Sequence, residues 1–383
     1  MSGQAVRRVV LVGAGHAHLY VARHARRFAE RGIELTLVDP GRLWYSGMAT
    51  GMLGGRYAPE EDQIDPCPVI ESQGGRFVLG RATGLDRRAR EVKLASGARL
   101  AYDVVSFNVG SRVVADPGWL GLEHVWTVKP IPELALLRER LEKRLAGGGS
   151  PPLRAVVVGG GATGCEVAAN LDALLRRLRA EGGVTVAEGE HRLLSGYPAG
   201  AARTLRRAFR RRGIEVSLGD AVRDARQGEL LLESGRRLPW DVLVIATGLK
   251  PAALVAQLGL PLSADGALRV DASLASVGDD RVFAAGDCAA LDGHRLPRLG
   301  VFGVRQAPVL LENLLARADE KPLAHYRPQR LYLSILNLGD GTGLAAWGPF
   351  YWVAPWCMRW KEKLDRRFVE RYQRYDTTRS LGR

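Results

Sequence analysis

The chain opens with an apolar run, a glycine-rich turn and a longer stretch of helix-forming residues. Apolar and β-branched side chains fill most positions from Val6 to Val12, and GAGHAH follows from Gly13 to His18. An alanine- and arginine-rich stretch continues to Arg31. A second apolar run, Ile33 to Val38, is closed by the acidic Asp39. This order predicts a strand, a turn, a helix and a second strand.

The same order of elements recurs in the middle of the chain. The apolar run Ala155 to Val158 leads into GGGATG, from Gly159 to Gly164, and a helical pattern follows to about Ala180. The next apolar run, Val184 to Ala187, is again closed by an acid, Glu188. The sequence therefore predicts two copies of one nucleotide-binding pattern.

Further repeats downstream of each copy indicate an internal duplication. SGARLAYDVV from Ser96 is echoed 138 residues later by SGRRLPWDVL from Ser234. The same offset pairs Gly110 with Gly248. A duplicated module explains both correspondences, because unrelated segments do not keep a fixed period over this length.

We predict an α/β fold with two Rossmann-like dinucleotide-binding domains, the second inserted in the first, and a small C-terminal region with an amphipathic helix. The glycine- and proline-rich segment Gly147 to Pro152 breaks a predicted helix, Glu133 to Ala146, and marks the boundary between the repeated modules. The predicted domains are residues 1–114 with 265–322, residues 115–264, and the C-terminal region 323–383.

Composition limits the classes of protein and the kinds of binding partner that are compatible with the sequence. A formal charge of +14 favours an anionic partner, either nucleic acid or an anionic membrane surface. No apolar run approaches the roughly 20 residues of a membrane-spanning helix, and no signal peptide is recognised. The four cysteines are far apart and form neither a CxxC pair nor a metal-ligand cluster, so we expect a reducing, cytoplasmic setting. They are Cys67, Cys165, Cys288 and Cys357.

The second glycine-rich turn carries the complete GxGxxG pattern. Gly159 and Gly161 have no Cβ to obstruct a pyrophosphate, and Gly164 permits close packing of helix and strand. The helix N-terminus would supply N–H donors to the phosphates. Glu188 is placed to accept a hydrogen bond from a ribose 2′-hydroxyl, and its charge would repel a 2′-phosphate. The turn therefore predicts a site that takes NADH in preference to NADPH.

The first turn departs from the pattern at one position. Gly13, Gly15 and Asp39 keep the groups that meet a pyrophosphate and a ribose, but His18 occupies the third glycine position. His16 and His18 are spaced i,i+2 without further metal ligands nearby, so we expect local packing or hydrogen bonding and no metal site.

A third signature follows the second copy. RVFAAGDCA, from Arg281 to Ala289, predicts a short buried strand that ends in Gly286 and Asp287. Together with the ATG of Ala246 to Gly248, it resembles the pyridine nucleotide-disulfide oxidoreductase superfamily. The resemblance implies that the first turn holds FAD, that the second holds NAD(P)H, and that Asp287 hydrogen-bonds the flavin's ribityl chain.

Within this superfamily, two segments resemble type II NADH:quinone dehydrogenases: WYSGMATGM from Trp44 and PRLGVFGVRQAP from Pro297. The motifs GHAH, YSGM and WKxxxDRRF are similar to the flavin domain fused to some bacterial selenophosphate synthases. The likeness runs from Val6 to about Tyr372. It implies that the loop from Tyr45 to Met48 lies beside the flavin ring.

The resemblance also implies roles for Gln306 and Glu166, the two expected catalytic residues. Gln306 is expected to open a helix aimed at the flavin carbonyl edge, where a helix start would stabilise negative charge. Glu166 matches a glutamate near the nicotinamide and flavin, but it is equally explained as an acid in the first turn of a helix. The expected cofactor-binding residues are Gly13, Gly15, His16, Asp39, Ser46, Gly47, Met48, Ala82, Gly110, Gly159, Gly161, Thr163, Gly164, Glu188, Thr247, Gly248, Gly286, Asp287 and Gln306.

The cysteines argue against thiol chemistry. Disulfide reductases need two nearby thiols that face the flavin, and no CxxxxC spacing follows the first turn. Sulfide:quinone oxidoreductases also use paired cysteines, and Cys165, Cys288 and Cys357 offer no clear match. We therefore expect an acceptor other than a disulfide.

The C-terminal segment predicts an amphipathic helix after Pro355, with apolar residues at every fourth position among many basic ones. These features are typical of a helix that lies in a membrane interface, and we expect residues 352–374 to contact an anionic membrane, outside both dinucleotide sites. A helix packed on its own domain or across a homodimer explains the same stripe. No nucleic-acid-binding module accompanies the charge, so nucleic acid is not expected. The stripe consists of Trp356, Trp360, Leu364 and Phe368.

The sequence thus predicts an FAD-dependent NADH oxidoreductase that passes electrons through flavin to a quinone, or to another small acceptor, without thiol chemistry. We expect it on the cytoplasmic face of the inner membrane. Two alternatives stay open: a soluble NAD(P)H-dependent flavoprotein reductase with another acceptor, and a non-enzymatic flavin/NADH redox sensor.

Overall fold

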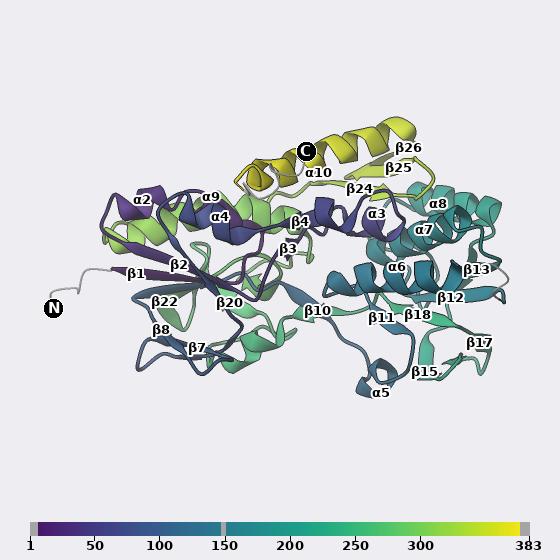
Figure 1. The fold of residues 1–383 in the computed structure, drawn as a ribbon, viewed down its shortest axis with the longest axis horizontal. Coiled ribbons are helices and arrows are strands. Elements are labelled where there is room, and N and C mark those ends of the chain that lie inside the picture. The colour runs from purple at the N-terminus through teal and green to yellow at the C-terminus, as the bar shows by residue number, and fades with distance from the viewer. Residues whose placement is uncertain (1–6, 147–150, 376–383) are drawn as a thin grey trace.

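The computed structural model of the chain describes residues 7–146 and 151–375. Two mostly parallel sheets lie side by side along the long axis of the molecule, and helices pack against both (Figure 1). The predicted α/β fold with two Rossmann-like units is confirmed. Val6 and residues 147–150 of the predicted connector lie outside the described residues.

The first sheet combines strands from the N-terminal part of the chain with strands after residue 267, in the order β23-β20-β21-β22-β9-β1-β2-β5. Strand β1 pairs in parallel with both β2 and β9. Its residues from Val9 to Val12 are all buried, which explains the unbroken apolar run, because a strand covered on both faces needs no polar side. The strands are β1 (Arg8–Val12), β2 (Glu34–Asp39), β5 (Arg76–Leu79), β9 (Val104–Phe107), β20 (Leu268–Val270), β21 (Ala275–Ser276), β22 (Asp279–Ala284) and β23 (Ala289–Leu291).

The helices of the first unit are shorter than the sequence predicts. The helix expected to reach Arg31 ends at Ala22 as α1 (His16–Ala22), and a separate turn, α2 (Arg26–Ala29), follows. Helix α1 packs against α9 (Gly300–Ala318), so the two ends of the first unit's sequence meet over its sheet. The connecting segment between β2 and β5 carries β3 (Leu43–Trp44), α3 (Ala49–Leu53), β4 (Gln63–Ile64) and α4 (Pro66–Glu71).

The second sheet has the order β11-β18-β12-β13-β14. Its central strands are joined through helices as the repeated pattern predicts, and the helix expected at Glu133 to Ala146 is present with closely similar bounds. The strands are β11 (Val125–Thr127), β12 (Leu153–Val158), β13 (Gly182–Glu188), β14 (Glu215–Leu218) and β18 (Val242–Ile245), and the helices are α5 (Pro117–Leu120), α6 (Pro132–Leu145), α7 (Ala162–Arg177) and α8 (Ala199–Arg212).

The structure bears out the internal repeat. In each unit a three-stranded antiparallel sheet precedes a fully buried parallel strand, β9 in the first and β18 in the second. The chain passes between the two units twice. The two connecting segments, β10 (Ser111–Val113) and β19 (Leu249–Pro251), pair as antiparallel strands. The two three-stranded sheets are β6 (Ala82–Asp86), β7 (Glu91–Leu94) and β8 (Arg99–Ala101), and β15 (Val222–Arg226), β16 (Glu229–Leu232) and β17 (Arg237–Pro239).

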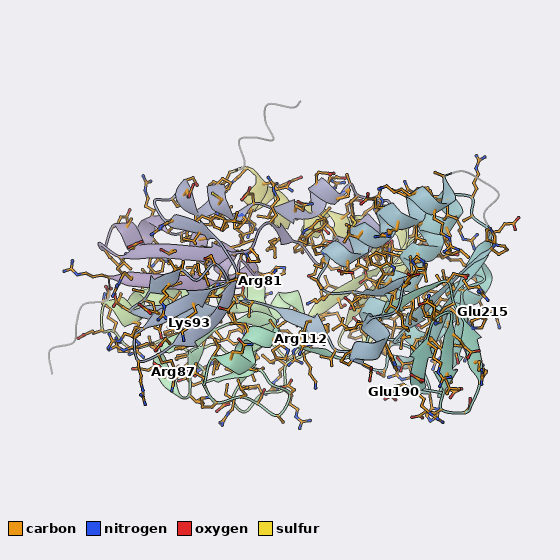
Figure 2. All side chains as sticks on the ribbon, turned by 60° about the horizontal axis from the view of Figure 1, so that its bottom comes forward. Arg81, Arg87, Lys93, Arg112, Glu190 and Glu215 are labelled. Atoms are coloured by element: carbon orange, nitrogen blue, oxygen red, sulfur yellow. The ribbon has the colours of Figure 1, made fainter. Side chains whose placement is uncertain are left out.

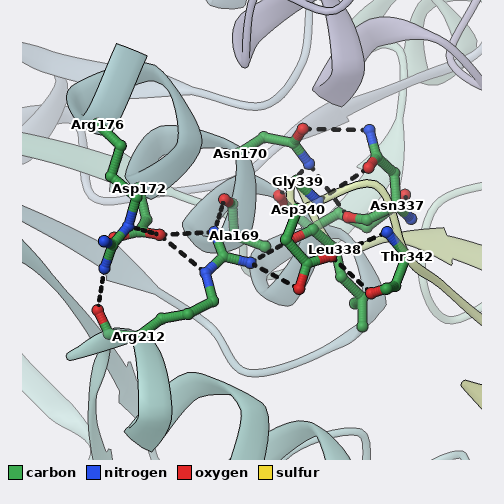
Figure 3. Close-up of polar contacts among 11 residues, drawn as sticks. Ala169, Asn170, Asp172, Arg176, Arg212, Asn337, Leu338, Gly339, Asp340 and Thr342 are labelled. Carbon is green, nitrogen blue, oxygen red and sulfur yellow. Dashed lines mark hydrogen bonds and ion pairs between the residues drawn. The ribbon is translucent and has the colours of Figure 1, made fainter. Parts of the chain in front are cut away.

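The C-terminal region forms a three-stranded sheet and a long helix that together contact both units. The sheet of β24 (Leu333–Asn337), β25 (Gly343–Trp347) and β26 (Phe350–Ala354) packs on α7 and α8 of the second unit. Arg212 of α8 donates hydrogen bonds to Asp172 and the carbonyl oxygen of Ala169 on α7, and also to the carbonyl oxygen of Leu338 (Figure 3). This arginine therefore joins two helices and the following sheet at one point.

Helix α10 (Pro355–Gln373) turns back over the first unit (Figure 1). Gln373 Nε2 donates to the carbonyl oxygen of Gln63 at 2.7 Å, and Arg366 forms an ion pair with Glu61 at 3.0 Å. Within the described ranges, no helix combines the length and the apolar character that a bilayer-spanning segment requires.

Candidate functional site

The first glycine-rich turn meets the end of β9 closely. Gly13 has a φ of +88°, and a Cβ built there would approach the carbonyl oxygen of Asn108 to 2.7 Å. The N–H of Ala14 donates to Asp39 Oδ2 at 2.7 Å, so the acid at the end of β2 also fixes the turn. Burial raises the pKa of Asp39, although the N–H groups of Ala14 and Gly41 oppose this shift. Both carboxylate oxygens retain a lone pair for a ribose hydroxyl.

His18 has a structural role that explains how it replaces the third glycine. Its ring is fully buried, with Nδ1 2.6 Å from the carbonyl oxygen of Gly13 and Nε2 2.8 Å from Ser106 Oγ. Burial lowers the pKa of His18 to about 3. The neutral ring donates from Nδ1 to Gly13, because a carbonyl oxygen can only accept, and it ties the helix to the turn. In the second copy, Gly164 lies directly against the carbonyl oxygen of Gly159, the equivalent atom.

A cavity of about 920 Å³ extends from the first turn along the edge of the sheet. This volume lies within the range of small-molecule and cofactor sites, roughly 300–1,000 Å³. The cavity is lined by β2, β3 and β6, by the segments that follow β1, β9 and β22, and by residues 129–132, 252–254 and 257. Nine expected cofactor-binding residues line it: Gly13, Gly15, His16, Asp39, Ser46, Ala82, Gly110, Gly286 and Asp287.

Asp287 lies in this cavity with two partners, Lys129 and Ser111, that the sequence analysis did not predict. Lys129 Nζ is 2.8 Å from Asp287 Oδ2 and 2.8 Å from Ser111 Oγ, and Ser111 Oγ donates to the same carboxylate at 2.6 Å. Burial alone would raise the pKa of Asp287, but the Lys129 ammonium and the Ser111 hydroxyl outweigh it, and the net shift is downward. Asp287 therefore stays ionised beside a cation. Lys129 follows no motif, so only the fold brings it to this site.

Gln306 does not open a helix, which corrects the sequence prediction. Helix α9 begins at Gly300, and Gln306 lies in its second turn with only 2% of its surface exposed. Its Oε1 accepts a hydrogen bond from the N–H of Gly286 at 2.7 Å. Gln306 therefore holds the backbone of the turn that immediately precedes Asp287. Gly303 of the same helix lies against Gly286, so the first turn of α9 approaches this turn closely.

The loop from Tyr45 to Met48 lies between the cavity and α10. Ser46 lines the cavity, whereas Met48 is 1% exposed and packs into the core. The Tyr45 ring stacks on Phe368 with centroids 4.7 Å apart, and His16 packs against both rings. Burial lowers the pKa of His16 to about 4, so its ring is neutral at neutral pH. Helix α10 contributes no residue to the cavity lining, but Phe368 packs against His16 of the cavity wall.

The second glycine-rich turn is built like the first. A Cβ at Gly159, whose φ is +113°, would approach the carbonyl oxygen of Ala246 and Thr247 Cγ2 to 3.0 Å, while Gly161 faces open space. The N–H of Gly160 donates to Glu188 Oε2, just as Ala14 does to Asp39. Thr163, which is exposed, follows in the first turn of α7, and Gly248 is exposed beyond Thr247. The backbone at Gly161 is therefore accessible from outside the turn.

Glu166 lies on α7 where the two units and the C-terminal region meet. Its Oε1 accepts from the N–H of Asn337 at 2.6 Å, and its carboxylate also interacts with Thr50 of α3 and the Lys361 ammonium. Burial raises the pKa of Glu166, and the Lys361 charge only partly opposes this shift. Glu166 lies beyond the first turn of α7, so the alternative explanation of an acid in the first turn of a helix is wrong. The residue contacts both other parts of the protein.

Beneath the Tyr45 loop lies a buried polar cluster that the sequence analysis did not identify. Lys361 Nζ donates to Asp365 Oδ2 at 2.8 Å and to the carbonyl oxygen of Gly47 at 2.7 Å. Tyr45 Oη donates to Asp365 Oδ1. Asp62 is fully buried, and among the described residues its carboxyl oxygens have no hydrogen-bond partner. Burial, with the Asp365 charge, raises the pKa of Asp62 to about 9, so it is protonated at neutral pH. Lys361 and Asp365 both belong to the WKxxxD pattern, so this pattern is the sequence signal that could have revealed the cluster.

The cysteines remain separate in the structure. All four are free thiols, and Cys165, Cys288 and Cys357 are buried. Burial raises the pKa of Cys288 to about 11 and that of Cys165 further. None of these three thiols lines the cavity.

Two joined Rossmann-like units, each with a glycine turn locked by an acid, define a two-dinucleotide oxidoreductase. A sequence profile of the pyridine nucleotide-disulphide oxidoreductases matches residues 7–308, and the chain belongs to this family. Binding of FAD and NAD(P)H is typical of the family, and the protein is an FAD-dependent pyridine-nucleotide oxidoreductase.

The named relatives include an NADH dehydrogenase-like protein and a ferredoxin–NAD(+) reductase. The chain is 32% identical over 297 residues to an NADH dehydrogenase-like protein of Mycobacterium tuberculosis, covering 74% of this chain and 73% of that protein. It is 32% identical over 294 residues to the ferredoxin–NAD(+) reductase component of the biphenyl dioxygenase system of Paraburkholderia xenovorans, covering 74% and 67%. NDH2 from Plasmodium falciparum, solved with NADH, has the same fold with a TM-score of 0.79 at 14% identity, over 96% of this chain and 98% of that one.

Proposed function

We propose that the enzyme transfers electrons from NADH through FAD to a quinone at the surface of an anionic membrane. The observation that carries this proposal is a continuous row of solvent-exposed aromatic rings on the C-terminal region. Phe350, Trp352, Trp356 and Trp360 follow one another with centroid separations of 6.4, 6.3 and 6.3 Å. Each ring is between 41% and 59% exposed. We call these four residues the aromatic row.

The aromatic row favours contact with a lipid surface. Indole rings prefer the headgroup region of a bilayer, and an exposed apolar row of this kind is uncommon on proteins that contact only water. Leu364, one helical turn beyond Trp360, extends the row and is 45% exposed. A quinone is a membrane-soluble acceptor, so an enzyme held at the bilayer meets its acceptor there.

We assign FAD to the cavity beside the first glycine-rich turn, and residues 1–114 with 265–322 to the FAD-binding unit. Gly13 and Gly15 would face the pyrophosphate, Asp39 a ribose, and Asp287 with Ser111 the ribityl hydroxyls. The N-terminus of α9 at Gly300 borders the same cavity and would stabilise negative charge there. When bound, FAD accepts hydride from a nicotinamide and passes electrons to an acceptor.

We assign NADH to the second unit, residues 115–264. Gly161 would face the pyrophosphate, and Glu188 would accept from the adenosine ribose. Glu166 would lie on the side of this site that faces the first unit, where its contacts with Asn337 and Lys361 hold it in place. The negative charge of Glu188 favours NADH over NADPH.

The likeness to a ferredoxin–NAD(+) reductase favours a second candidate, a protein acceptor of electrons. Stopped-flow and steady-state measurements distinguish the candidates. NADH should bleach the flavin absorbance rapidly, and a short-chain quinone should then support turnover at a comparable rate. Rapid bleaching with turnover on an added ferredoxin but not on quinones would overturn the quinone assignment. If NADH does not bleach the flavin, the proposed electron path itself is wrong.

A further inference from the structure

Helix α8 carries a face of solvent-exposed arginines. Arg203, Arg206, Arg207 and Arg210 are all exposed, and we call them the arginine face. Within residues 7–146 and 151–375, none of these four side chains makes a hydrogen bond or an ion pair. Arg212, at the end of the same helix, contrasts with them because it is partly buried and bonded to Asp172.

The arginine face is held on a rigid support. Ala201, Ala202, Leu205 and Phe209 form the opposite side of α8, and all four are buried. The helix continues into edge strand β14, and between the two lies a hollow of about 760 Å³ bordered by the arginine face and residues 213–216. Glu215 is the acid at this hollow, and it accepts a hydrogen bond from Thr185 Oγ1. Four cations therefore surround a concave site that contains one carboxylate.

Tyr351 joins the N-terminal part of α8, the helix that carries the arginine face, to the strand where the aromatic row begins. The Tyr351 ring packs against Gly200 of α8, and its Oη lies 3.5 Å from Thr204 Oγ1. Its two neighbours in β26, Phe350 and Trp352, point from the opposite face of the strand and begin the aromatic row. The N-terminal part of α8 and the start of the row thus meet at strand β26.

We propose that the arginine face binds the phosphate headgroups of anionic phospholipids while the aromatic row enters the same bilayer. Guanidinium groups donate pairs of hydrogen bonds to phosphate oxygens, and four of them around one hollow match a dense anionic surface. An acidic protein or a nucleic acid would use the charge but would leave the adjacent indoles in water. The inference rests on the proposed membrane contact and adds a second contact, from the NADH unit.

The test compares two charge-matched variants of the FAD-loaded protein. One replaces the arginine face: Arg203→Gln, Arg206→Gln, Arg207→Gln and Arg210→Gln. The control replaces four other exposed arginines, Arg26→Gln, Arg87→Gln, Arg88→Gln and Arg295→Gln, with the same change in net charge. Arg87 and Glu215 lie at opposite ends of the molecule, so the control removes charge away from the hollow (Figure 2). Circular dichroism and FAD content verify folding.

Co-sedimentation with vesicles of phosphatidylcholine, with and without phosphatidylglycerol, supplies the readout. Loss of the arginine face should weaken binding to phosphatidylglycerol vesicles by about tenfold or more, and the control much less. Binding to pure phosphatidylcholine should not change. Equal losses in both variants would overturn the inference, and so would an unchanged affinity. If the wild type binds no vesicle at all, the membrane part of the proposed function fails instead.

A competition experiment separates the bilayer from other anionic partners. Heparin, a soluble polyanion, should displace the wild type from phosphatidylglycerol vesicles only partly, because the aromatic row remains inserted. Complete displacement by heparin at low concentration would show that the arginine face serves a soluble partner and would overturn the lipid assignment.

Discussion

Tyr45 donates a hydrogen bond of 3.0 Å to Asp365, which lies 320 residues further along the chain. The same two segments are joined again where Lys361 donates to the carbonyl oxygen of Gly47. These bonds connect the YSGM loop at the cavity to the WKxxxD pattern of the last helix. The two motifs therefore form one structural unit, and α10 supports the proposed flavin site as well as presenting the aromatic row.

Asp287→Ala should weaken FAD binding by about 10- to 100-fold, because a hydrogen bond to a charged group contributes roughly 1.5–3 kcal/mol. The FAD-to-protein ratio after gel filtration, followed by titration with FAD, measures this loss. Asp292→Ala removes an exposed partner of Arg269 and should retain flavin. Full flavin retention in Asp287→Ala would place the ribityl chain elsewhere.

Glu188→Gln should raise kcat/KM for NADPH by about tenfold or more relative to NADH, because the repulsion of a 2′-phosphate is removed. The glutamine keeps an oxygen to accept from the N–H of Gly160, so the turn should persist. Glu190→Gln removes a nearby exposed charge and serves as the control (Figure 2). Equal preference for the two cofactors in the wild type would show that Glu188 does not face the ribose.

Trp356→Ser combined with Trp360→Ser should weaken vesicle binding by about tenfold or more at every salt concentration. Burial of each large apolar side chain contributes roughly 1.5–3 kcal/mol, and salt does not screen this contribution. The matched control is Leu79→Ser with Leu120→Ser, two exposed apolar residues outside the C-terminal region. An equal effect of both pairs would contradict a specific role for the row.

Asp62→Asn should stabilise the protein increasingly as the pH rises. The folded pKa of about 9 lies above the ordinary value of 3.8, so the folded state holds a proton that the unfolded state has lost. Wild-type stability contributed by this group is therefore complete below about pH 4 and falls progressively as the pH approaches 9. The Tm difference between variant and wild type should widen from about pH 5 to about pH 8.

Asp292→Asn supplies the reference for this measurement. Its carboxylate is exposed and ion-paired, and interactions with Arg269 lower its pKa, so its effect should not vary over the same interval. A constant Tm difference for Asp62→Asn would show that Asp62 is ionised in the folded protein and that a further cation neutralises it.

Replacement of all four cysteines by serine should leave most NADH-dependent acceptor turnover intact. Serine hydroxyls can keep the hydrogen bonds that Cys165 and Cys288 donate to the carbonyl oxygens of Gly160 and Ala285. Some stability should be lost, because a hydroxyl is costlier to bury than a thiol. A folded, FAD-loaded variant without turnover would indicate thiol chemistry.

The sequence predicted those parts of the fold that depend on local pattern. Strands such as β1 and β18 are unbroken apolar runs, and the turns at Gly13 and Gly159 need glycine because the next strand lies against them. Local pattern failed where tertiary contacts decide the outcome. The helix expected to open at Gln306 begins earlier, at Gly300, where glycines let α9 approach His16 and Gly286.

For the candidate site too, the sequence predicted the residues that lie in motifs and missed those that only tertiary packing brings together. Motif residues reached the cavity, but Lys129 carries no motif and arrives there only through the packing of the two units. Lys361 and Asp365 read as polar positions on a helix surface, yet both are nearly buried, because Gly47 and Tyr45 supply their partners. Such contacts join residues that lie hundreds of positions apart, so no local sequence pattern indicates them.

The insertion of one unit within the other also sets the order in which the nascent protein can assemble. The second sheet has all of its strands once residue 245 has left the ribosome, although its synthesis starts later. The first sheet still lacks β22, which pairs with β9, until residue 284 emerges. Helix α10, which covers the Tyr45 loop, follows last. The half of the enzyme that is started first is therefore the half that is finished last.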